Sequence, residues 1–126
     1  MGYHVHDVDG IAVVELTGDF WGGDETKKIS DAFANLMTGG NGRIVIDLSK
    51  TSYLNSTALG VLVKLHTTVS RQGGKLALTG ISKRIHNIFL ITKLAFVFDT
   101  YEKLDQAVEA LKKVKIPEKP PEAGGI

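Results

Sequence analysis

The sequence predicts one α/β domain built on a mixed sheet of about five strands with about four helices. Near the N-terminus, Asp9-Gly10 joins two strand-like runs, which is typical of an antiparallel hairpin. The apolar run 44–48 contains three β-branched residues and predicts a strand buried on both faces. From there on, strand-like and helix-like segments alternate, which favours parallel strands joined by crossover helices.

The composition is that of an ordinary globular protein. The chain has 126 residues, of which 43% are hydrophobic and 23% charged, and its formal net charge is +1. This near-neutral charge gives no broad electrostatic case for nucleic acid or an acidic membrane surface. There is no cysteine, no signal-like N-terminus and no apolar run near the roughly 18 residues of a membrane span. We therefore expect a cytoplasmic protein without direct membrane insertion.

The first half of the chain begins with the two hairpin strands, 3–8 and 11–16, and a turn-rich loop at 17–23. A helix is expected after Asp24, with its apolar face formed by Ile29, Ala32, Phe33, Leu36 and Met37. His4 and His6 share one strand face with metal-ligand spacing. Because no third ligand is obvious, we expect a solvated or partner-covered face, with neither metal nor cofactor.

The second half continues with a strand at 75–79 and a helix capped by Ser82 that runs to about Thr92. A further strand is expected at 95–98, followed by a helix capped by Thr100. The apolar face of this last helix would comprise Leu104, Ala107, Val108 and Leu111. The domain is expected to span 1–115. Residues 116–126 contain all three prolines and predict a disordered tail.

The segment after the strand 44–48 has the strongest functional signal. A helix follows it, and Asn55, Ser56 and Thr57 are three candidate caps at its start. A small hydroxyl is therefore expected at the carboxyl end of a strand, where α/β sheets usually bind ligands. A capping role alone would explain Ser56. The same position also suits a phosphate, because free N–H groups and the helix dipole stabilise an anion there.

The helix after Ser56 has apolar residues on more than one side. One stripe comprises Leu59, Leu62, Val63, His66 and Val69, and a second comprises Ala58, Val61 and Leu65. Such a helix is either deeply buried or covers a partner. We interpret the second stripe as a binding surface, with tight packing between neighbouring helices as the alternative. A phosphate on Ser56 beside this surface would oppose docking of a partner.

Several blocks of the sequence resemble bacterial anti-sigma factor antagonists, the STAS domains. The segments 46–49 and 53–60 read IDLS and YLNSTALG, similar to the family pattern V-x-D-L-S followed by D-S-S/T-G-L-G. The segment 16–19, LTGD, resembles the family's L-x-G-E/D. Further similarity lies in the segment 74–78 and in Ile81, Ser82, Ile88, Phe89, Leu94 and Phe98. The resemblance covers roughly residues 3 to 112.

The resemblance implies a STAS fold that acts by binding and is not an enzyme. The implied partner is an anti-sigma factor serine kinase, which binds the antagonist instead of sigma and phosphorylates it to end the interaction. The phosphorylated serine of the family falls on Ser56, with Thr57 as the alternative acceptor, and a serine phosphatase is a further candidate partner. The expected partner-binding residues are Asp19, Asn55, Ser56, Thr57, Ala58, Val61 and Leu65.

Two positions depart from the family pattern. Asn55 replaces the acidic residue before the serine, and Ala58 replaces the glycine. Both favour an alternative function, a STAS subunit of a transport ATPase or a stress-signalling scaffold that is not phosphorylated. A small-molecule or nucleotide binder using the loops around Asp19 and Ser56 ranks lowest, because no nucleotide motif is present. No Ser/His/acid set or carboxylate pair indicates catalysis.

Overall fold

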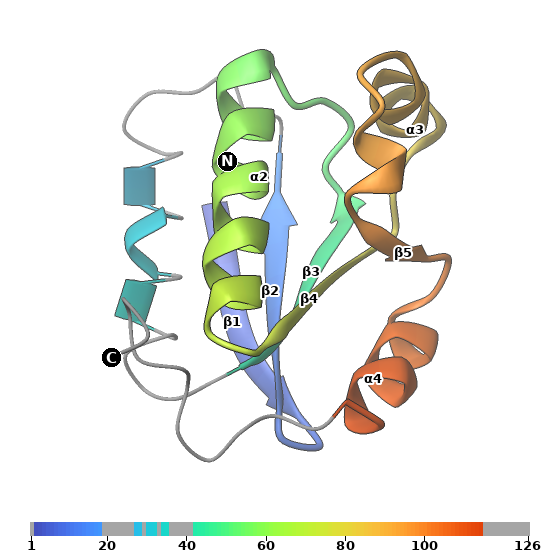
Figure 1. Ribbon diagram of the computed structural model, residues 1–126. Helices are drawn as coiled ribbons and strands as arrows, with labels where there is room; N and C mark the ends of the chain where they lie inside the picture. Colours follow the sequence, from blue (N-terminus) through green and yellow to red (C-terminus); the bar gives the residue numbers. More distant parts are fainter. Residues whose placement is uncertain (1, 19–26, 29, 33, 36–41, 115–126) are drawn as a thin grey trace.

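The computed structural model describes residues 2–18, 27, 28, 30–32, 34, 35 and 42–114. Within these ranges the chain forms one five-stranded sheet with helices on both faces (Figure 1). Asp19 and the predicted tail 116–126 lie outside the described residues.

The strands lie side by side in the order in which they occur along the chain. Only the first pair is antiparallel, and the three following pairs are parallel. This confirms the predicted mixed sheet. The strands are β1 (Gly2–Val8), β2 (Ile11–Thr17), β3 (Arg43–Lys50), β4 (Lys75–Thr79) and β5 (Asp99–Tyr101).

The hairpin between β1 and β2 forms as predicted. Asp9 and Gly10 both have positive φ values, 55° and 85°, as a type I′ turn requires. The Asp7 carboxylate accepts a 3.0 Å hydrogen bond from the Gly10 N–H. Val8 and Ile11 are therefore paired directly across the turn.

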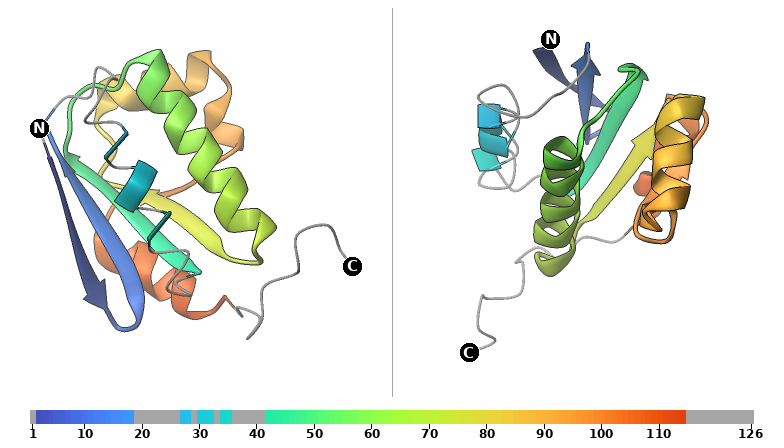
Figure 2. Two further views of the ribbon diagram at one scale, coloured as in Figure 1. Left: turned by 90° about the vertical axis from the view of Figure 1, so that its left-hand side faces the viewer. Right: turned by 90° about the horizontal axis from the view of Figure 1, so that it is seen from above.

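The helices form two layers around the sheet. The described elements are α2 (Ser56–Arg71), α3 (Lys83–Ile91), the short 3₁₀ helix η1 (Leu94–Phe96) and α4 (Leu104–Lys112). α2 and α3 cover one face and α4 the other (Figures 1 and 2). Residues 27, 28, 30–32, 34 and 35 are helical, as predicted, and lie beside α2 (Figure 2). No helix among the described residues is long and apolar enough to cross a membrane.

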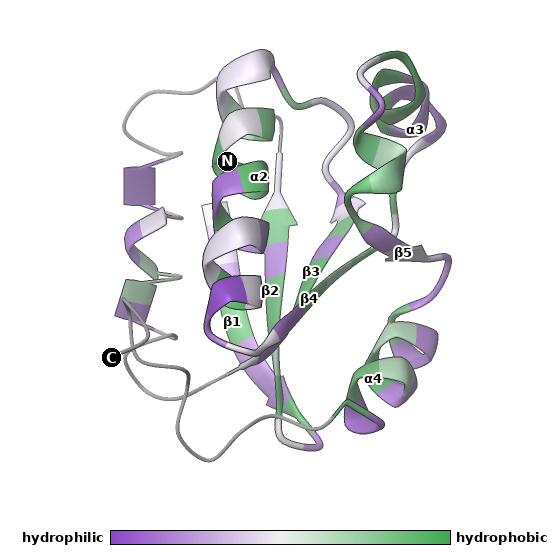
Figure 3. Ribbon diagram, viewed as in Figure 1, coloured by the Kyte–Doolittle hydropathy of each residue, from purple (hydrophilic) through white to green (hydrophobic). Residues whose placement is uncertain are grey.

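The core has two parts because β3 buries side chains on both faces. Ile44, Ile46 and Leu48 face α2 and α3, whereas Val45 faces α4. All four side chains are fully buried, which explains the continuous apolar run without polar alternation. The central strands β3 and β4 accordingly carry hydrophobic segments, whereas β5 is hydrophilic, and the helices combine hydrophobic and hydrophilic segments (Figure 3).

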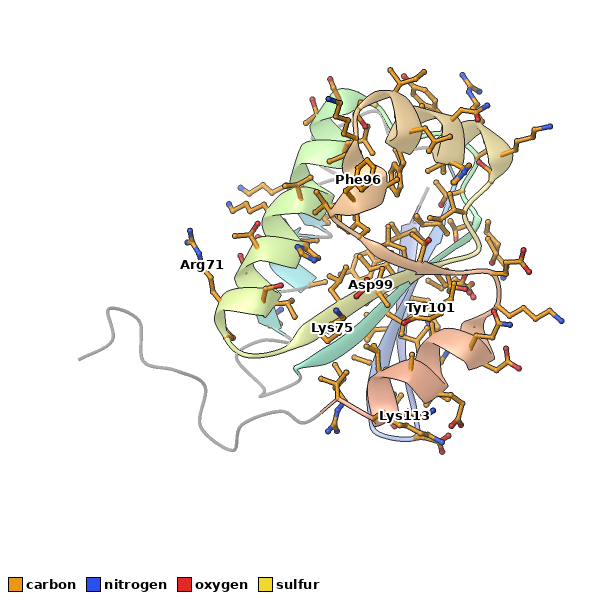
Figure 4. All side chains as sticks on the ribbon, turned by 45° about the vertical axis from the view of Figure 1, so that its right-hand side comes forward. Arg71, Lys75, Phe96, Asp99, Tyr101 and Lys113 are labelled. Atoms are coloured by element: carbon orange, nitrogen blue, oxygen red, sulfur yellow. The ribbon has the colours of Figure 1, made fainter. Side chains whose placement is uncertain are left out.

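The prediction of a strand at 95–98 is wrong. Lys93 adopts a left-handed conformation with φ 63°, and the chain then turns into η1. The N–H groups of Val97 and Phe98 both donate to the Leu94 carbonyl, at 2.9 and 3.2 Å. These local hydrogen bonds occupy the donors that a strand would use for pairing, so β5 begins only at Asp99. Lys75 of β4 pairs with Asp99, and Figure 4 shows both.

The predicted cap of the last helix is also wrong. Thr100 lies within β5, and α4 begins after Lys103. The Gln106 side chain closes this end, since its Oε1 accepts from the Lys103 N–H at 3.2 Å. The predicted apolar face of α4 is confirmed, because Ala107, Val108 and Leu111 are buried against the sheet.

Candidate functional site

The chain leaves β3 through a turn that several hydrogen bonds fix. The Asp47 carboxylate accepts from the Ser49 N–H at 2.9 Å, and the Thr51 N–H donates to the Leu48 carbonyl at 3.0 Å. The Thr51 hydroxyl is buried and donates to the Leu16 carbonyl of β2 at 3.1 Å. The loop that leads to α2 therefore starts from a defined position at the carboxyl edge of the sheet.

The start of α3 lies against the same loop. Gly80 has φ +70°, and a Cβ atom there would lie 2.7 Å from the Ser49 nitrogen, so only glycine allows this approach. The Arg84 guanidinium lies over the Tyr53 ring, 4.6 Å from its centroid, within the range of a cation–π contact. The segments that follow β3 and β4 therefore contact each other at the carboxyl edge of the sheet, where ligands usually bind in α/β proteins.

Asn55 is the cap of α2. Its backbone is extended, its Oδ1 accepts from the Ala58 N–H at 2.9 Å, and its carbonyl accepts from the Leu59 N–H. Of the three candidate caps, the structure thus selects the first. Ser56 is the first helical residue instead, and its side chain is exposed, as is that of Thr57. The Ser56 hydroxyl therefore takes no part in capping this helix.

The first turn of α2 has a positive electrostatic character. Because Ser56 and Thr57 open the helix, their backbone N–H groups have no acceptor within it. The turn contains no acidic residue. At the same edge of the sheet, Lys50 and Glu15 form a 3.0 Å ion pair, and the hydrogen bond from Lys50 holds the pKa of Glu15 below its ordinary value of 4.5. This carboxylate is thus already paired with a cation. The α2 terminus, which has no acidic residue in its first turn, suits an added anion.

The second apolar stripe of α2 is not an exposed binding surface. Ala58 and Leu65 are buried, with only 4% and 6% of their surface exposed, and Val61 is half-buried against the same core. The alternative, tight packing, therefore holds for Ala58 and Leu65, because both side chains are buried in the core. The Ala58 methyl group consequently points into the protein and does not obstruct a partner.

The surface that α2 does expose runs along the opposite side of the helix. We call it the α2 ridge, and it comprises Ser56, Thr57, Gly60, Lys64 and Thr67. Nothing lies within 4 Å of a Cβ atom placed on Gly60, so this part of the ridge is open. Ser56 and Thr57 were identified from the sequence, but Gly60, Lys64 and Thr67 were missed, because none of these three contributes to an apolar stripe. Their helical spacing opposite the buried stripe was the available signal.

The two histidines noted in the sequence lie on the edge strand β1. The rings of His4 and His6 are 5.6 Å apart on β1. Among the residues that the structure describes, no three His, Asp or Glu side chains group together as metal ligands. Asp19 falls in the part of the chain that is not described.

A family model for the STAS domain matches residues 4–107. The chain belongs to the STAS domain family. The match includes most of β1, the whole of β2 to β5, the turn after β3 and the α2 ridge. This confirms the resemblance on which the sequence-based assignment depends.

Known STAS proteins resemble this one in sequence and fold. The anti-sigma-B factor antagonist of Bacillus subtilis is 39% identical over 64 residues, which cover 51% of this chain and 59% of that protein. A crystal structure of a Thermotoga maritima protein described as a putative anti-sigma factor antagonist aligns with a TM-score of 0.78 at 19% identity, over 88% and 95% of the two chains. The Bacillus cell-fate determinant SpoIIAA, solved in its phosphorylated form, aligns at 0.69 and 14%, over 86% and 98%. At these identities the two structural matches show the fold alone.

Proposed function

We propose that this STAS domain is an anti-sigma factor antagonist that binds a serine-kinase anti-sigma factor and is released when the kinase phosphorylates Ser56. The proposal depends on one observation at the start of α2: the cap and the exposed hydroxyl belong to two different residues. Asn55 caps the helix, which leaves the exposed Ser56 hydroxyl available for chemistry. In this cycle the antagonist is a binding partner and a substrate of the kinase, and does not itself catalyse a reaction.

Phosphorylation at this position is compatible with the fold. The phosphate would add about −1.5 to −2 charges at neutral pH. The unpartnered N–H groups of the first turn and the helix dipole would stabilise it by about 0.3–1 kcal/mol at an exposed site. The hydrogen bond from the Ala58 N–H to Asn55 would remain, because it does not involve the serine side chain. Modification is therefore expected to change the surface and not the core.

The partner would bind the α2 ridge. The ridge around Ser56 offers a small, open surface, particularly at Gly60, which allows another protein's backbone to approach closely. A phosphate beside it would have to be desolvated in the complex, which is costly for a charge without a cationic partner. The unmodified serine thus permits binding and the phosphoserine prevents it.

Known relatives support this proposal in kind. The Bacillus subtilis relative is named an anti-sigma-B factor antagonist, and SpoIIAA was solved in a phosphorylated form. By analogy, a serine phosphatase would restore the binding form, and the cycle would take place in the cytoplasm. Asn55 provides the cap without the family's acidic charge, so the kinase of this system would recognise a neutral residue before the serine.

The test is phosphorylation by the serine-kinase anti-sigma factor of the source organism, with ATP and Mg²⁺, followed by mapping of the modified residue by mass spectrometry. We expect one phosphate on Ser56 in the wild type and in Thr57→Ala, and none in Ser56→Ala. Thr57→Ala is the matched control, since it removes the neighbouring exposed hydroxyl. Binding of the anti-sigma factor without any phosphorylation would show that Ser56 is not a phosphorylation switch, and the proposal would be wrong.

A further inference from the structure

An exposed apolar cluster lies where α3 turns into η1. We call it the α3–η1 tip, and it comprises Leu90, Ile91, Phe96 and Val97, which are 55%, 82%, 90% and 39% exposed. Phe96 projects from the short helix η1 and is labelled in Figure 4. Exposures this high mean that Ile91 and Phe96 extend into solvent with little support from neighbouring side chains.

The tip is nevertheless firmly attached to the core. Phe89 precedes its first residue and Phe98 follows its last, and these two buried rings stack with centroids 5.6 Å apart. The left-handed Lys93 reverses the chain between them. The exposed apolar side chains are therefore presented by a short, anchored turn, which makes their exposure a fixed property of the fold.

Acidic and basic charges are strongly segregated along the sequence. All 14 acidic residues of the chain lie at or before Asp47 or at or after Asp99. The segment between them includes the end of β3, α2, β4, α3 and η1. Its charged residues are all basic: Lys50, Lys64, Arg71, Lys75, Lys83, Arg84 and Lys93. Lys50 and Lys75 pair with acidic residues outside the segment. Within the described residues the other five form no ion pair. The near-neutral chain therefore contains a long basic segment between Asp47 and Asp99.

We propose that the α3–η1 tip docks peripherally on an anionic phospholipid bilayer. Phe96, Ile91 and Leu90 would enter the boundary between headgroups and acyl chains, and Lys93 would contact anionic headgroups. Lys83 and Arg84, at the other end of α3, would add longer-range attraction to the same surface. Such docking needs only a few projecting apolar side chains within a basic surface, and no membrane-spanning helix. This assignment is independent of the proposed role of Ser56.

Two features favour a bilayer over other occupants. A second copy of this chain would bring two basic surfaces together, and like charges oppose that contact. In addition, Ile91 and Phe96 project outward from a turn, with 82% and 90% of their surface exposed. Projecting side chains of this kind match a fluid interface that adapts to their shape, and the basic surroundings match its negative charge.

The test is co-sedimentation of the full chain with vesicles of mixed phosphatidylglycerol and phosphatidylcholine, and with vesicles of phosphatidylcholine alone. We expect binding to the mixed vesicles that weakens with added salt, and little binding to the neutral ones. Phe96→Ser should weaken partition by roughly tenfold or more, given the apolar area of a Phe side chain. Lys93→Glu should do the same, because each basic residue near the surface contributes about a fivefold effect.

Matched controls separate the tip from general effects. Lys113→Glu makes the same charge change at an exposed position far from Phe96 (Figure 4). Tyr3→Ser removes an exposed aromatic side chain from β1. Both should bind the mixed vesicles nearly as the wild type does, and unchanged thermal melts will show that all variants fold.

Three outcomes would overturn the proposal. The first is absence of wild-type binding to the anionic vesicles, and the second is an equal loss in Lys113→Glu. The third is a change of occupant: Phe96→Ser leaves vesicle binding intact but abolishes self-association in sedimentation velocity or binding of the anti-sigma factor. In that case the tip is a protein interface.

Discussion

Helices α2 and α3 both begin at the carboxyl edge of the sheet, but they use serine differently. At α3, the Ser82 hydroxyl is itself the cap and accepts from the Ile85 N–H at 3.1 Å. At α2, Asn55 caps through its Oδ1 at 2.9 Å, and Ser56 is the next residue. One serine is therefore committed to the fold, while the other is exposed and available. Ser82 stands at the cap position and has a structural role, whereas Ser56 stands one residue after the cap and is a candidate regulatory residue.

The largest effect that this comparison predicts is on partner binding. Ser56→Asp should weaken binding of the anti-sigma factor on the order of a hundredfold, because an unpaired charge within an interface costs several kcal/mol. Ser82→Asp is the matched variant, since aspartate caps helices well and should preserve binding. Isothermal titration calorimetry would measure both. Equal losses in the two variants would show that negative charge anywhere at this edge is sufficient.

The next effect is on stability. Asn55→Ala and Ser82→Ala should each lower the free energy of unfolding by about 1 kcal/mol, because each removes the acceptor that caps a helix. Urea denaturation followed by circular dichroism would give both values. If Asn55→Ala had no effect, another group would be capping α2, and the assignment of Asn55 would fail.

A smaller effect is expected where the family residue is restored. Asn55→Asp keeps the capping oxygen and adds a negative charge at the positive end of α2, which has no acidic residue in its first turn. Stability should rise by about 0.3–1 kcal/mol at low salt. The gain should shrink as salt is added, since exposed charges are screened. A salt-independent change would point to altered hydrogen bonding as its cause.

The smallest effect is predicted for Ser56→Ala. The hydroxyl is exposed and does not cap the helix, so the free energy of unfolding should change by no more than about 0.5 kcal/mol. The same denaturation experiment measures it beside Ser82→Ala. A loss as large as that of Ser82→Ala would mean that Ser56 has a structural role, and the contrast between the two serines would disappear.

Much of the fold was predictable because its signals are local. The Asp9-Gly10 turn requires positive φ, and the run 44–48 is apolar because β3 is buried on both faces. Ser82 capped its helix as predicted. By contrast, the apolar run 95–98 has the composition of a strand. The left-handed turn at Lys93, which decides its conformation, has no glycine to announce it.

The site was predictable in position but not in detail. The hydroxyl-rich start of α2 after β3 could be found from the sequence, whereas the choice of Asn55 as cap depends on a single hydrogen bond. The role of Ala58 and Leu65 was missed because hydropathy shows how many sides of a helix are apolar, but not how many neighbours enclose it. Burial of both residues moves the expected contact surface to the α2 ridge.

We propose that a phosphate on Ser56 ends binding of the anti-sigma factor without disturbing the fold. The most direct measurement is a titration of the anti-sigma factor against two fractions of one preparation, phosphorylated on Ser56 and unmodified. We expect phosphorylation to weaken binding on the order of a hundredfold, as for Ser56→Asp, while the circular dichroism spectrum and melting temperature stay the same. Equal affinity of the two fractions would contradict it.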